Sequence, residues 1–175
     1  FLWEKYQASH EVKFVNVPFE GVVAEILTKI DNTHMGVVLK RMMLRAAEQV
    51  ASNLKLESMV TGEAIAQVSS QTLANLKIID DVTDKLVLRP LIVSDKQEIV
   101  DTAKKIGTYE FAASMPEYCG VISDKPTTCA KKGKVLAVEE HFDMSVLEQA
   151  VAQAEIKNVS EVGLDSLEDL PEVAE

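Results

Sequence analysis

The sequence predicts an α/β fold in which a parallel sheet is flanked by helices. Short apolar or alternating runs, which are typical of strands, alternate along the chain with longer stretches of helical spacing. A strand, a helix and a further strand in that order form a βαβ unit, so the strands are expected to lie parallel with helices on both faces. The composition, 47% hydrophobic and 26% charged over 175 residues, fits one globular domain.

The first elements are a strand and two helices. Residues 12–17 alternate apolar and other side chains and end at Pro18, which predicts a short strand. Residues 20–30 and 35–54 have helical spacing, and the second segment is the longest helical pattern in the chain. Its methionines are expected to pack in the core rather than bind a cofactor.

The middle of the chain repeats this order. Residues 58–61 and 86–88 are short apolar runs, predicted to be buried strands, and residues at about 69–79 form a helix between them. After the second run, Ser94 and Gln97 have the spacing of a capping box. The helix that they begin is expected to end at Gly107.

The last third has a different character. Residues 107–130 show little periodicity and are predicted to be a loop. Residues 131–156 are predicted to form one or two polar helices, with Ser145 as a cap. Residues 158–175 are acidic, which indicates a linker or tail.

Charge and length limit the classes of function. The net charge of −10 opposes a phosphate backbone, so this chain is not expected to supply most of any nucleic-acid affinity, although Lys40, Arg41 and Arg45 could form a local basic strip. No apolar run spans a bilayer, and the first residues lack the features of a signal peptide. The two cysteines do not indicate a disulfide framework, and a cytoplasmic location is expected.

Polar residues after the first predicted buried strand indicate a ligand site. Gly62 follows residues 58–61 at their carboxyl end, the edge at which open α/β sheets bind ligands, and would let a planar ligand approach the backbone. The alternative is a tight-turn glycine with a solvated Glu63. Gln71 belongs to a polar cluster that could bind a base or ribose, or simply cap a helix.

Two further residues are candidates for chemistry. Lys96 would lie in the first turn of its helix, where a cation is disfavoured unless an anion such as phosphate is held nearby; an exposed lysine is the alternative. Cys119 lies beside Gly120 in an irregular segment that is followed by several lysines, which could lower the pKa of the thiol. Cys119 and Cys129 make a poor zinc site, and no metal site is predicted.

Four strings resemble the tRNA 4-thiouridine synthetase family in order and spacing. They are VLKRMMLRAAEQVA (38–51), VTGEAIAQVSSQTLANLKIID (60–80), LVLRPLIVSDKQEIVDTAKKIGT (86–108) and MPEYCGVIS (115–123). The resemblance covers most of residues 10–155. It implies a PP-loop fold, of the adenine nucleotide alpha hydrolase-like type.

The resemblance also implies an enzyme that transfers sulfur to the uridine at position 8 of tRNA, with ATP and Mg²⁺ as cofactors. The uridine carbonyl oxygen is a poor leaving group until it is adenylated; sulfur from a persulfide then displaces AMP and gives 4-thiouridine. Mg²⁺ and basic groups would offset charge on the departing pyrophosphate.

The family's roles carry over to five residues. Gly62 and Gln71 match positions of the adenosine pocket, and Lys40 matches another nucleotide-contacting position. Lys96 matches a functionally important lysine suited to phosphate charge. Cys119 matches the cysteine that attacks or resolves the persulfide through a transient disulfide, so Cys119 and Lys96 are the predicted catalytic residues.

The chain also departs from the family pattern. The phosphate loop, a Ser-Gly-Gly-x-Asp-Ser string, and the N-terminal tRNA-binding module are absent from the sequence. Residues 1–157 are therefore interpreted as a partial PP-loop domain truncated at its N-terminal side, and residues 158–175 as a linker or tail. The fragment alone is expected to be inactive. A longer parent would bind tRNA mainly through the absent module.

The sulfur donor implied by the family is a cysteine desulfurase or a rhodanese-like module that carries a persulfide, and some members support thiamine biosynthesis. An exposed edge strand could pair two copies as a homodimer. Two alternatives remain open: a sibling PP-loop enzyme such as a tRNA 2-thiouridylase, and a non-enzymatic interaction domain in which Cys119 is structural.

Overall fold

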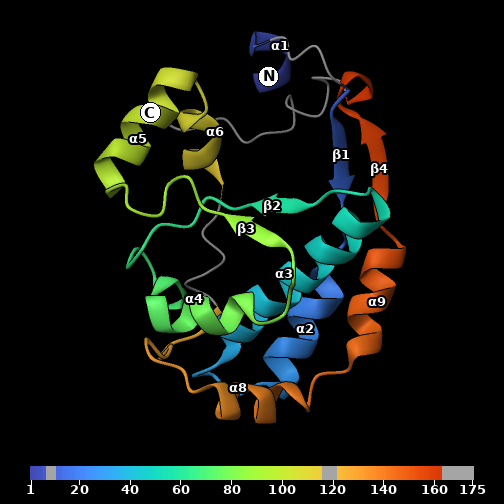
Figure 1. The fold of residues 1–175 in the computed structure, drawn as a ribbon, viewed down its shortest axis with the longest axis vertical. Coiled ribbons are helices and arrows are strands. Elements are labelled where there is room, and N and C mark those ends of the chain that lie inside the picture. Colours follow the sequence, from blue (N-terminus) through green and yellow to red (C-terminus); the bar gives the residue numbers. More distant parts are fainter. Residues whose placement is uncertain (7–10, 116–121, 163–175) are drawn as a thin grey trace.

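The computed structural model describes residues 1–6, 11–115 and 122–162, and its first elements follow the predicted order (Figure 1). A short helix, α1 (Leu2–Tyr6), precedes them. The elements up to residue 106 are β1 (Lys13–Asn16), α2 (Glu20–Lys29), α3 (Met35–Asn53), β2 (Ser58–Val60), the 3₁₀ turn η1 (Ser69–Gln71), α4 (Leu73–Asp80), β3 (Leu86–Leu88) and α5 (Lys96–Ile106).

The predicted parallel pairing is confirmed for β2 and β3. Met59 lies opposite Val87 in a parallel register. The pairing continues past the strands, because the Thr61 amide donates to the Leu88 carbonyl at 2.9 Å and the Ile65 amide to the Ile92 carbonyl at 3.0 Å. The segments that leave both strands at their carboxyl ends are therefore held side by side.

The first strand pairs differently from the prediction. β1 forms an antiparallel pair with β4 (Glu155–Asn158), and Val15 lies opposite Ile156. Residues 131–156 were predicted to be helical. This is correct for α8 (Lys132–Glu139) and α9 (Met144–Ala152), but wrong for residues 155 and 156, which belong to β4. β4 contains a single apolar residue, Ile156, so the strand depends on pairing with β1 and leaves no periodic pattern.

The helix caps also correct the prediction. The capping box of α5 is formed by Asp95 and Glu98, not by Ser94 and Gln97. The Glu98 amide donates to the Asp95 carboxylate at 2.8 Å, and the Asp95 amide to the Glu98 carboxylate at 3.1 Å. α5 ends as expected at Gly107, with φ +85°. The carboxylates form charge-assisted bonds with the helix amides, which a neutral serine cannot match.

Two further local predictions fail. The cap of α9 is Asp143, which accepts a hydrogen bond from the Ser145 amide, so Ser145 lies inside the helix. The predicted loop at 107–130 contains a short helix, α6 (Tyr109–Ser114). This helix packs against α5 and not against the main core, so its sequence shows no apolar stripe.

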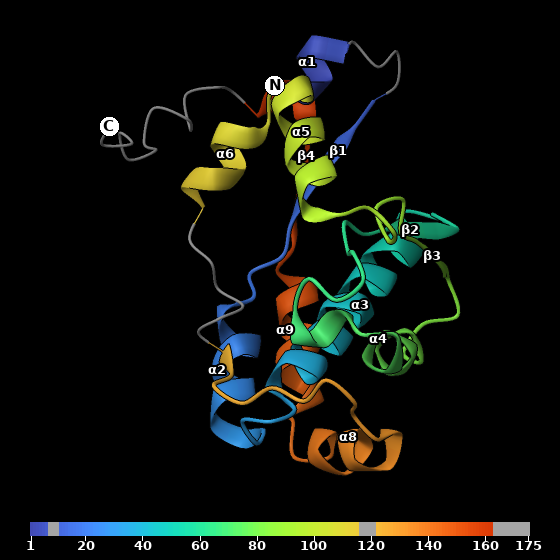
Figure 2. The same cartoon turned by 90° about the vertical axis from the view of Figure 1, so that its left-hand side faces the viewer.

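The hydrophobic core lies among helices and not between helices and a broad sheet. α2, α3, α4, α8 and α9 gather on one side of the strands, while α1, α5 and α6 lie at the other end (Figures 1 and 2). Fully buried side chains from four of these helices meet there: Val22, Val38, Ile79 and Leu147. Within the described ranges, no helix is both long enough and apolar enough to cross a membrane.

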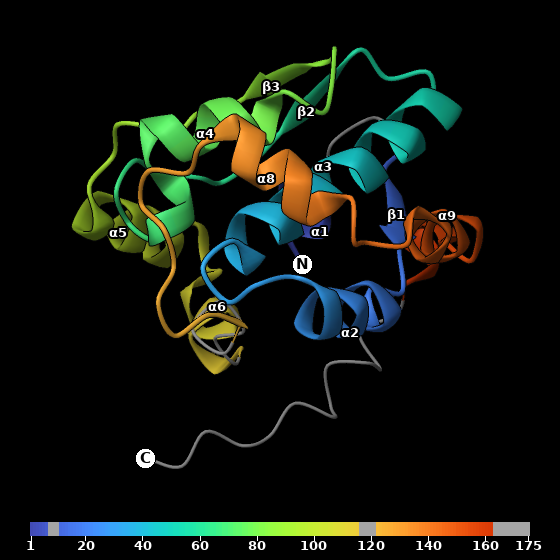
Figure 3. The same cartoon turned by 90° about the horizontal axis from the view of Figure 1, so that it is seen from below.

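A buried ion network joins α3 to α8, which crosses beneath it (Figure 3). Arg41 is 2% exposed and donates through Nε and Nη2 to the Glu139 carboxylate at 2.8 and 2.9 Å, and Nη1 donates to the Ile78 carbonyl. Arg45 also donates to Glu139, at 2.7 and 3.0 Å. Arg41 is therefore buried and does not belong to a surface basic strip, whereas Arg45 is partly exposed and shares the Glu139 carboxylate with Arg41.

Candidate functional site

A cavity of about 400 Å³ opens beside β2. One wall comes from α3, a second from β2 and the three residues that follow it, and the rest from η1 and α4. Its volume falls in the range of small-molecule sites, about 300–1,000 Å³. Because part of the wall lies at the carboxyl end of β2, the cavity is placed where parallel sheets of α/β proteins bind ligands.

Lys40, Gly62 and Gln71, the three predicted nucleotide-binding residues, all line this cavity. They come from α3, from the segment after β2 and from η1, so only the fold brings them together. Lys40 is half-buried, with 20% of its side chain exposed. The cavity thus combines the Lys40 ammonium, the backbone at Gly62 and the Gln71 amide. Together these groups suit a ligand that carries both negative charge and a planar polar group.

The surroundings of Gly62 argue against a purely structural glycine. A Cβ placed on Gly62 would meet no atom within 4 Å, so packing does not exclude a side chain. Among the described glycines, only Gly107 has the positive φ that favours glycine. Neither a tight turn nor close packing therefore requires a glycine at this position, and the free space in front of its backbone belongs to the cavity side.

Gln71 carries a buried side-chain oxygen without a partner. Oε1 of Gln71 is buried and accepts no hydrogen bond. The backbone around it is fixed: the Ala66 amide donates to the Gln71 carbonyl at 3.1 Å, and the Gln71 amide donates to the Val68 carbonyl at 2.9 Å. An unsatisfied buried acceptor costs about 1–3 kcal/mol, which a donor from a ligand would recover.

Glu63 is the centre of a second ion network at the cavity wall. Its Oε1 accepts from Lys40 at 2.9 Å, and its Oε2 accepts from Arg89 Nε at 2.7 Å and from the Thr61 hydroxyl at 3.1 Å. Arg89 in turn makes a bidentate pair with Asp80, at 2.9 and 2.6 Å. Burial alone would raise the pKa of Glu63, but the hydrogen bonds and charges of Lys40 and Arg89 outweigh it and lower that pKa.

The sequence did not predict this role for Glu63. Its alternative interpretation placed Glu63 in solvent, whereas the residue is 7% exposed. One signal was available: Glu63 and Arg89 each follow a parallel strand at the carboxyl end, where side chains of neighbouring strands meet. Their opposite charges, three residues after β2 and one residue after β3, could have predicted the pair.

Lys96 does not line the cavity. It is the first residue of α5 and is exposed. Figure 1 shows that α5 follows β3 on the side towards which β2 and β3 run, so Lys96 shares the carboxyl side of the parallel pair. The structure thus separates Lys96 from the three cavity residues, and its catalytic role stays a prediction.

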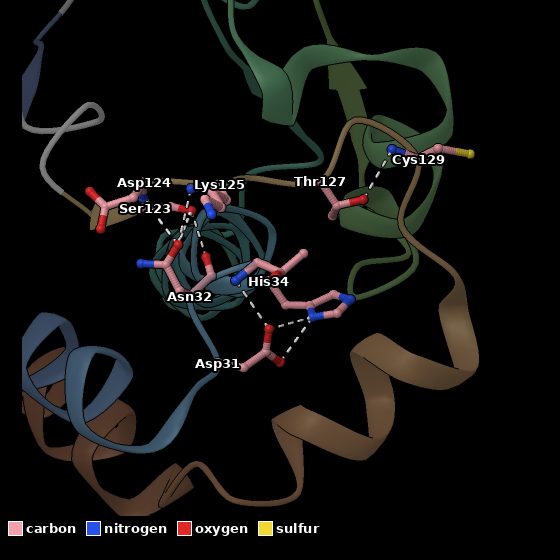
Figure 4. A network of polar contacts seen from close by, with 9 residues as sticks. Asp31, Asn32, His34, Ser123, Asp124, Lys125, Thr127 and Cys129 are labelled. Atoms are coloured by element: carbon pink, nitrogen blue, oxygen red, sulfur yellow. Dashed lines mark hydrogen bonds and ion pairs between the residues drawn. The ribbon is translucent and has the colours of Figure 1, made fainter.

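Cys119 lies outside the described residues, but residues 123–125, further along the chain, are hydrogen-bonded to Asn32 (Figure 4). The Asn32 side-chain oxygen accepts from the amides of Asp124 and Lys125 at 3.0 and 3.1 Å, and the Ser123 hydroxyl donates to the Asn32 carbonyl. Cys129 is an exposed free thiol.

The same segment is also tied to the wall that holds Gln71. Asn75 is completely buried, and its Nδ2 donates at 2.8 Å both to the Ser69 carbonyl of η1 and to the Thr127 carbonyl. The Ala130 amide donates back to Asn75 Oδ1 at 2.9 Å. The chain downstream of Cys119 and the wall of the cavity are therefore one hydrogen-bonded unit.

The fold and the cavity together define an α/β protein with a cavity at the carboxyl end of a parallel strand pair. Residues 1–144 match the family described as "Thiamine biosynthesis protein (ThiI)". The chain belongs to this family, as the resemblance implied.

Relatives of known name agree. The chain is 62% identical over 162 residues to the tRNA sulfurtransferase of Pseudomonas fluorescens, covering 93% of this chain and 34% of that protein. It is 58% identical over 173 residues to the tRNA sulfurtransferase of Tolumonas auensis, covering 99% of this chain and 36% of that protein. The chain thus spans about a third of the length of these curated relatives.

A solved structure also matches. It is the crystal structure of a 4-thiouridine synthetase–RNA complex with bound ATP, with a TM-score of 0.81 and 28% sequence identity. The match covers 90% of this chain and 42% of that one. The expected fold class is confirmed, and the division into residues 1–157 and 158–175 stays a prediction.

Proposed function

We propose that the cavity beside β2 binds the adenine nucleotide of a tRNA sulfurtransferase, and that the complete protein uses it to convert a tRNA uridine, at position 8, into 4-thiouridine. The observation that carries the proposal is the meeting of Lys40, Gly62 and Gln71 in one cavity from three separate elements. The relatives' shared name and the ATP and RNA of the matching structure support it.

The cavity residues would divide the recognition of ATP among them. Lys40 donates one N–H to Glu63, which leaves two N–H donors for a phosphate group. The unpartnered Gln71 oxygen would accept from a ligand N–H group, such as that of an adenine base. The backbone at Gly62 would lie against the planar part of the nucleotide, since no Cβ keeps it away.

Mg²⁺ would enter this site with the nucleotide. The described residues contain no group of three or more His, Cys, Asp and Glu side chains suited to hold a metal ion. Mg²⁺ would accompany the nucleotide and would offset the charge of the departing pyrophosphate. Lys96 would supply further positive charge from the start of α5.

The sulfur step would use Cys119. The outer sulfur of a donor persulfide attacks uridine C4, and the C4–O bond to AMP breaks. The Cys119 thiolate then attacks the donor's inner sulfur, so the C4-bound sulfur is released as the thiocarbonyl. Two thiols have become a disulfide between Cys119 and the donor, and their two electrons have reduced the transferred sulfur. The donor is proposed to be a cysteine desulfurase or a rhodanese-like module, in the cytoplasm.

Replacement of each cysteine tests this assignment. In the complete protein that contains this chain, Cys119→Ser should reduce 4-thiouridine formation in tRNA to background while ATP binding persists, because only the sulfur step loses its nucleophile. The matched control, Cys129→Ser, should stay within about twofold of the wild type, since its thiol is exposed and unpaired.

Mass spectrometry of the product tRNA provides the readout. Undiminished 4-thiouridine with Cys119→Ser would refute the sulfur role. Formation of 2-thiouridine instead would favour the sibling enzyme, and an absence of any ATP-dependent thiolation by the wild type would favour an interaction domain. Sedimentation of the complete protein tests the proposed homodimer, which would use an exposed strand edge.

A further inference from the structure

We infer that Glu63 is a positioning residue that sets the direction of the Lys40 ammonium in the nucleotide cavity. The inference rests on the proposed function, because it concerns how the same site holds ATP. It adds Glu63, which the sequence analysis placed in solvent, and it connects the cavity to two further charged groups, Arg89 and Asp80. The structure gives four observations in its favour.

The first observation is the place of Lys40. Its side chain leaves the second turn of α3, and it is long and flexible when free. In the cavity wall, Oε1 of Glu63 accepts a hydrogen bond from it at 2.9 Å. One fixed N–H determines where the other two N–H groups point, so Glu63 converts a mobile cation into an oriented one.

The second observation is that Glu63 is itself held. Its other oxygen accepts from Arg89 and from the Thr61 hydroxyl, and Arg89 is fixed by two hydrogen bonds to Asp80 at the end of α4. The planar guanidinium fork makes this backing stiff. The position of the Lys40 ammonium is thus tied to α4 and to the ends of both parallel strands.

The third observation is the burial of the Glu63–Arg89 pair. Only 9% of the Glu63 side chain and 10% of the Arg89 side chain are exposed, so water screens this pair little. A surface ion pair would contribute almost nothing to orientation, whereas a buried pair keeps one geometry.

The fourth observation is charge balance. Lys40 and Arg89 carry two positive charges, and Glu63 and Asp80 carry two negative charges. Each Glu63 oxygen already accepts a hydrogen bond from a cation, and these two cations offset the repulsion between the carboxylate and an incoming phosphate. A phosphate group would therefore be attracted by the two remaining Lys40 N–H donors and not by a net positive surface. The direction of these two donors then determines the affinity for ATP.

Kinetics of ATP-dependent tRNA thiolation by the complete protein test the inference. Glu63→Gln keeps the shape but removes the charge that holds Lys40, so the KM for ATP should rise about ten- to a hundredfold, the range for one charge-assisted hydrogen bond. The KM for tRNA should not change. Glu63→Asp keeps the charge on a shorter arm and should recover part of the loss. The matched control is Glu57→Gln, an exposed glutamate before β2, which should behave as wild type.

A double-mutant cycle with Lys40→Ala separates positioning from general damage. If Glu63 acts through Lys40, Glu63→Gln should change the KM for ATP by less than about twofold once Lys40 is alanine. Equal effects in both backgrounds would overturn the inference, as would a wild-type KM for ATP in the single Glu63→Gln variant. If Glu63→Gln does not fold, the same cycle with Glu63→Asp decides. Failure of the proposed function looks different, because the wild type itself would then show no ATP-dependent thiolation.

Discussion

Two ion networks start from neighbouring residues of α3 and lead to different ends. Arg41 turns into the core, where Glu139 and Arg45 complete a triad between α3 and α8. Lys40 turns towards the cavity, where Glu63, Arg89 and Asp80 continue the network. Successive residues on a helix of 3.6 residues per turn point about 100° apart, so one helix serves both directions.

The difference between the networks is what each leaves unsatisfied. Two Arg41 nitrogens bind Glu139 and the third binds the Ile78 carbonyl, so each side-chain nitrogen has an acceptor, and only 2% of the side chain is exposed. Lys40 is more exposed, at 20%, and one acceptor is assigned to its three N–H groups. A fully paired network stabilises the fold, whereas a partly paired one at a cavity retains capacity for a ligand.

The largest effect is expected from a substitution that breaks the core network. Glu139→Gln leaves two arginines without their shared counter-charge, so the free energy of unfolding should fall by about 3–5 kcal/mol. Urea denaturation of the complete protein measures it, with Glu140→Gln, the exposed residue directly after α8, as the matched control. The KM for ATP of the protein that remains folded should be unchanged. An altered KM with normal stability would remove the distinction between the two networks.

The stability that Glu139 contributes should depend on pH. Burial alone would raise the pKa of Glu139, but hydrogen bonds and charges from Arg41 and Arg45 outweigh it and lower that pKa in the folded protein. The unfolded chain therefore binds the proton first, and the stability contributed by Glu139 is present above about pH 4.3 and is lost as the pH falls through the lowered pKa. The difference in stability between wild type and Glu139→Gln should shrink below that pH. A difference that stays constant or grows with acid would contradict the assigned charge.

A smaller effect, on ATP affinity and not on stability, is expected from a substitution at Gly62 in the cavity wall. Gly62→Ala has room for its Cβ and needs no positive φ, so the free energy of unfolding should change by less than about 1 kcal/mol. If a nucleotide lies against this backbone, ATP affinity should nevertheless fall about three- to tenfold, the equivalent of one lost contact. Calorimetric titration with ATP measures it. Unchanged affinity would show that the ligand does not approach Gly62.

The smallest effect is expected at the start of α5, from substitutions of Asp95 and Ser94, which belong to neither network. Asp95→Ala removes the capping carboxylate of α5 and should lower the free energy of unfolding by about 1 kcal/mol. Ser94→Ala, at the position that the sequence predicted as the cap, should change it by less than about 0.5 kcal/mol. The reverse order in thermal denaturation would restore the sequence-based assignment.

Part of the candidate site was predictable, and part was not. Gly62 and Gln71 were visible because they follow an apolar strand and begin a helix, and Lys40 because a family string contained it. Glu63 was misjudged because burial of a carboxylate depends on partners that lie 23 and 26 residues away in sequence, at Lys40 and Arg89. A local pattern contains no information about such partners.

The sequence by itself determined the features that local physics controls. Apolar spacing defined α3, the apolar triplet at residues 86–88 defined β3, and Gly107 ended α5 because its left-handed backbone favours glycine. Only the tertiary structure decided that β4 pairs antiparallel with β1, that Arg41 is buried while Lys40 lines a cavity, and that Glu63 holds Lys40. These outcomes depend on side chains from distant segments, whose charges and backbone groups are satisfied only after the chain has folded.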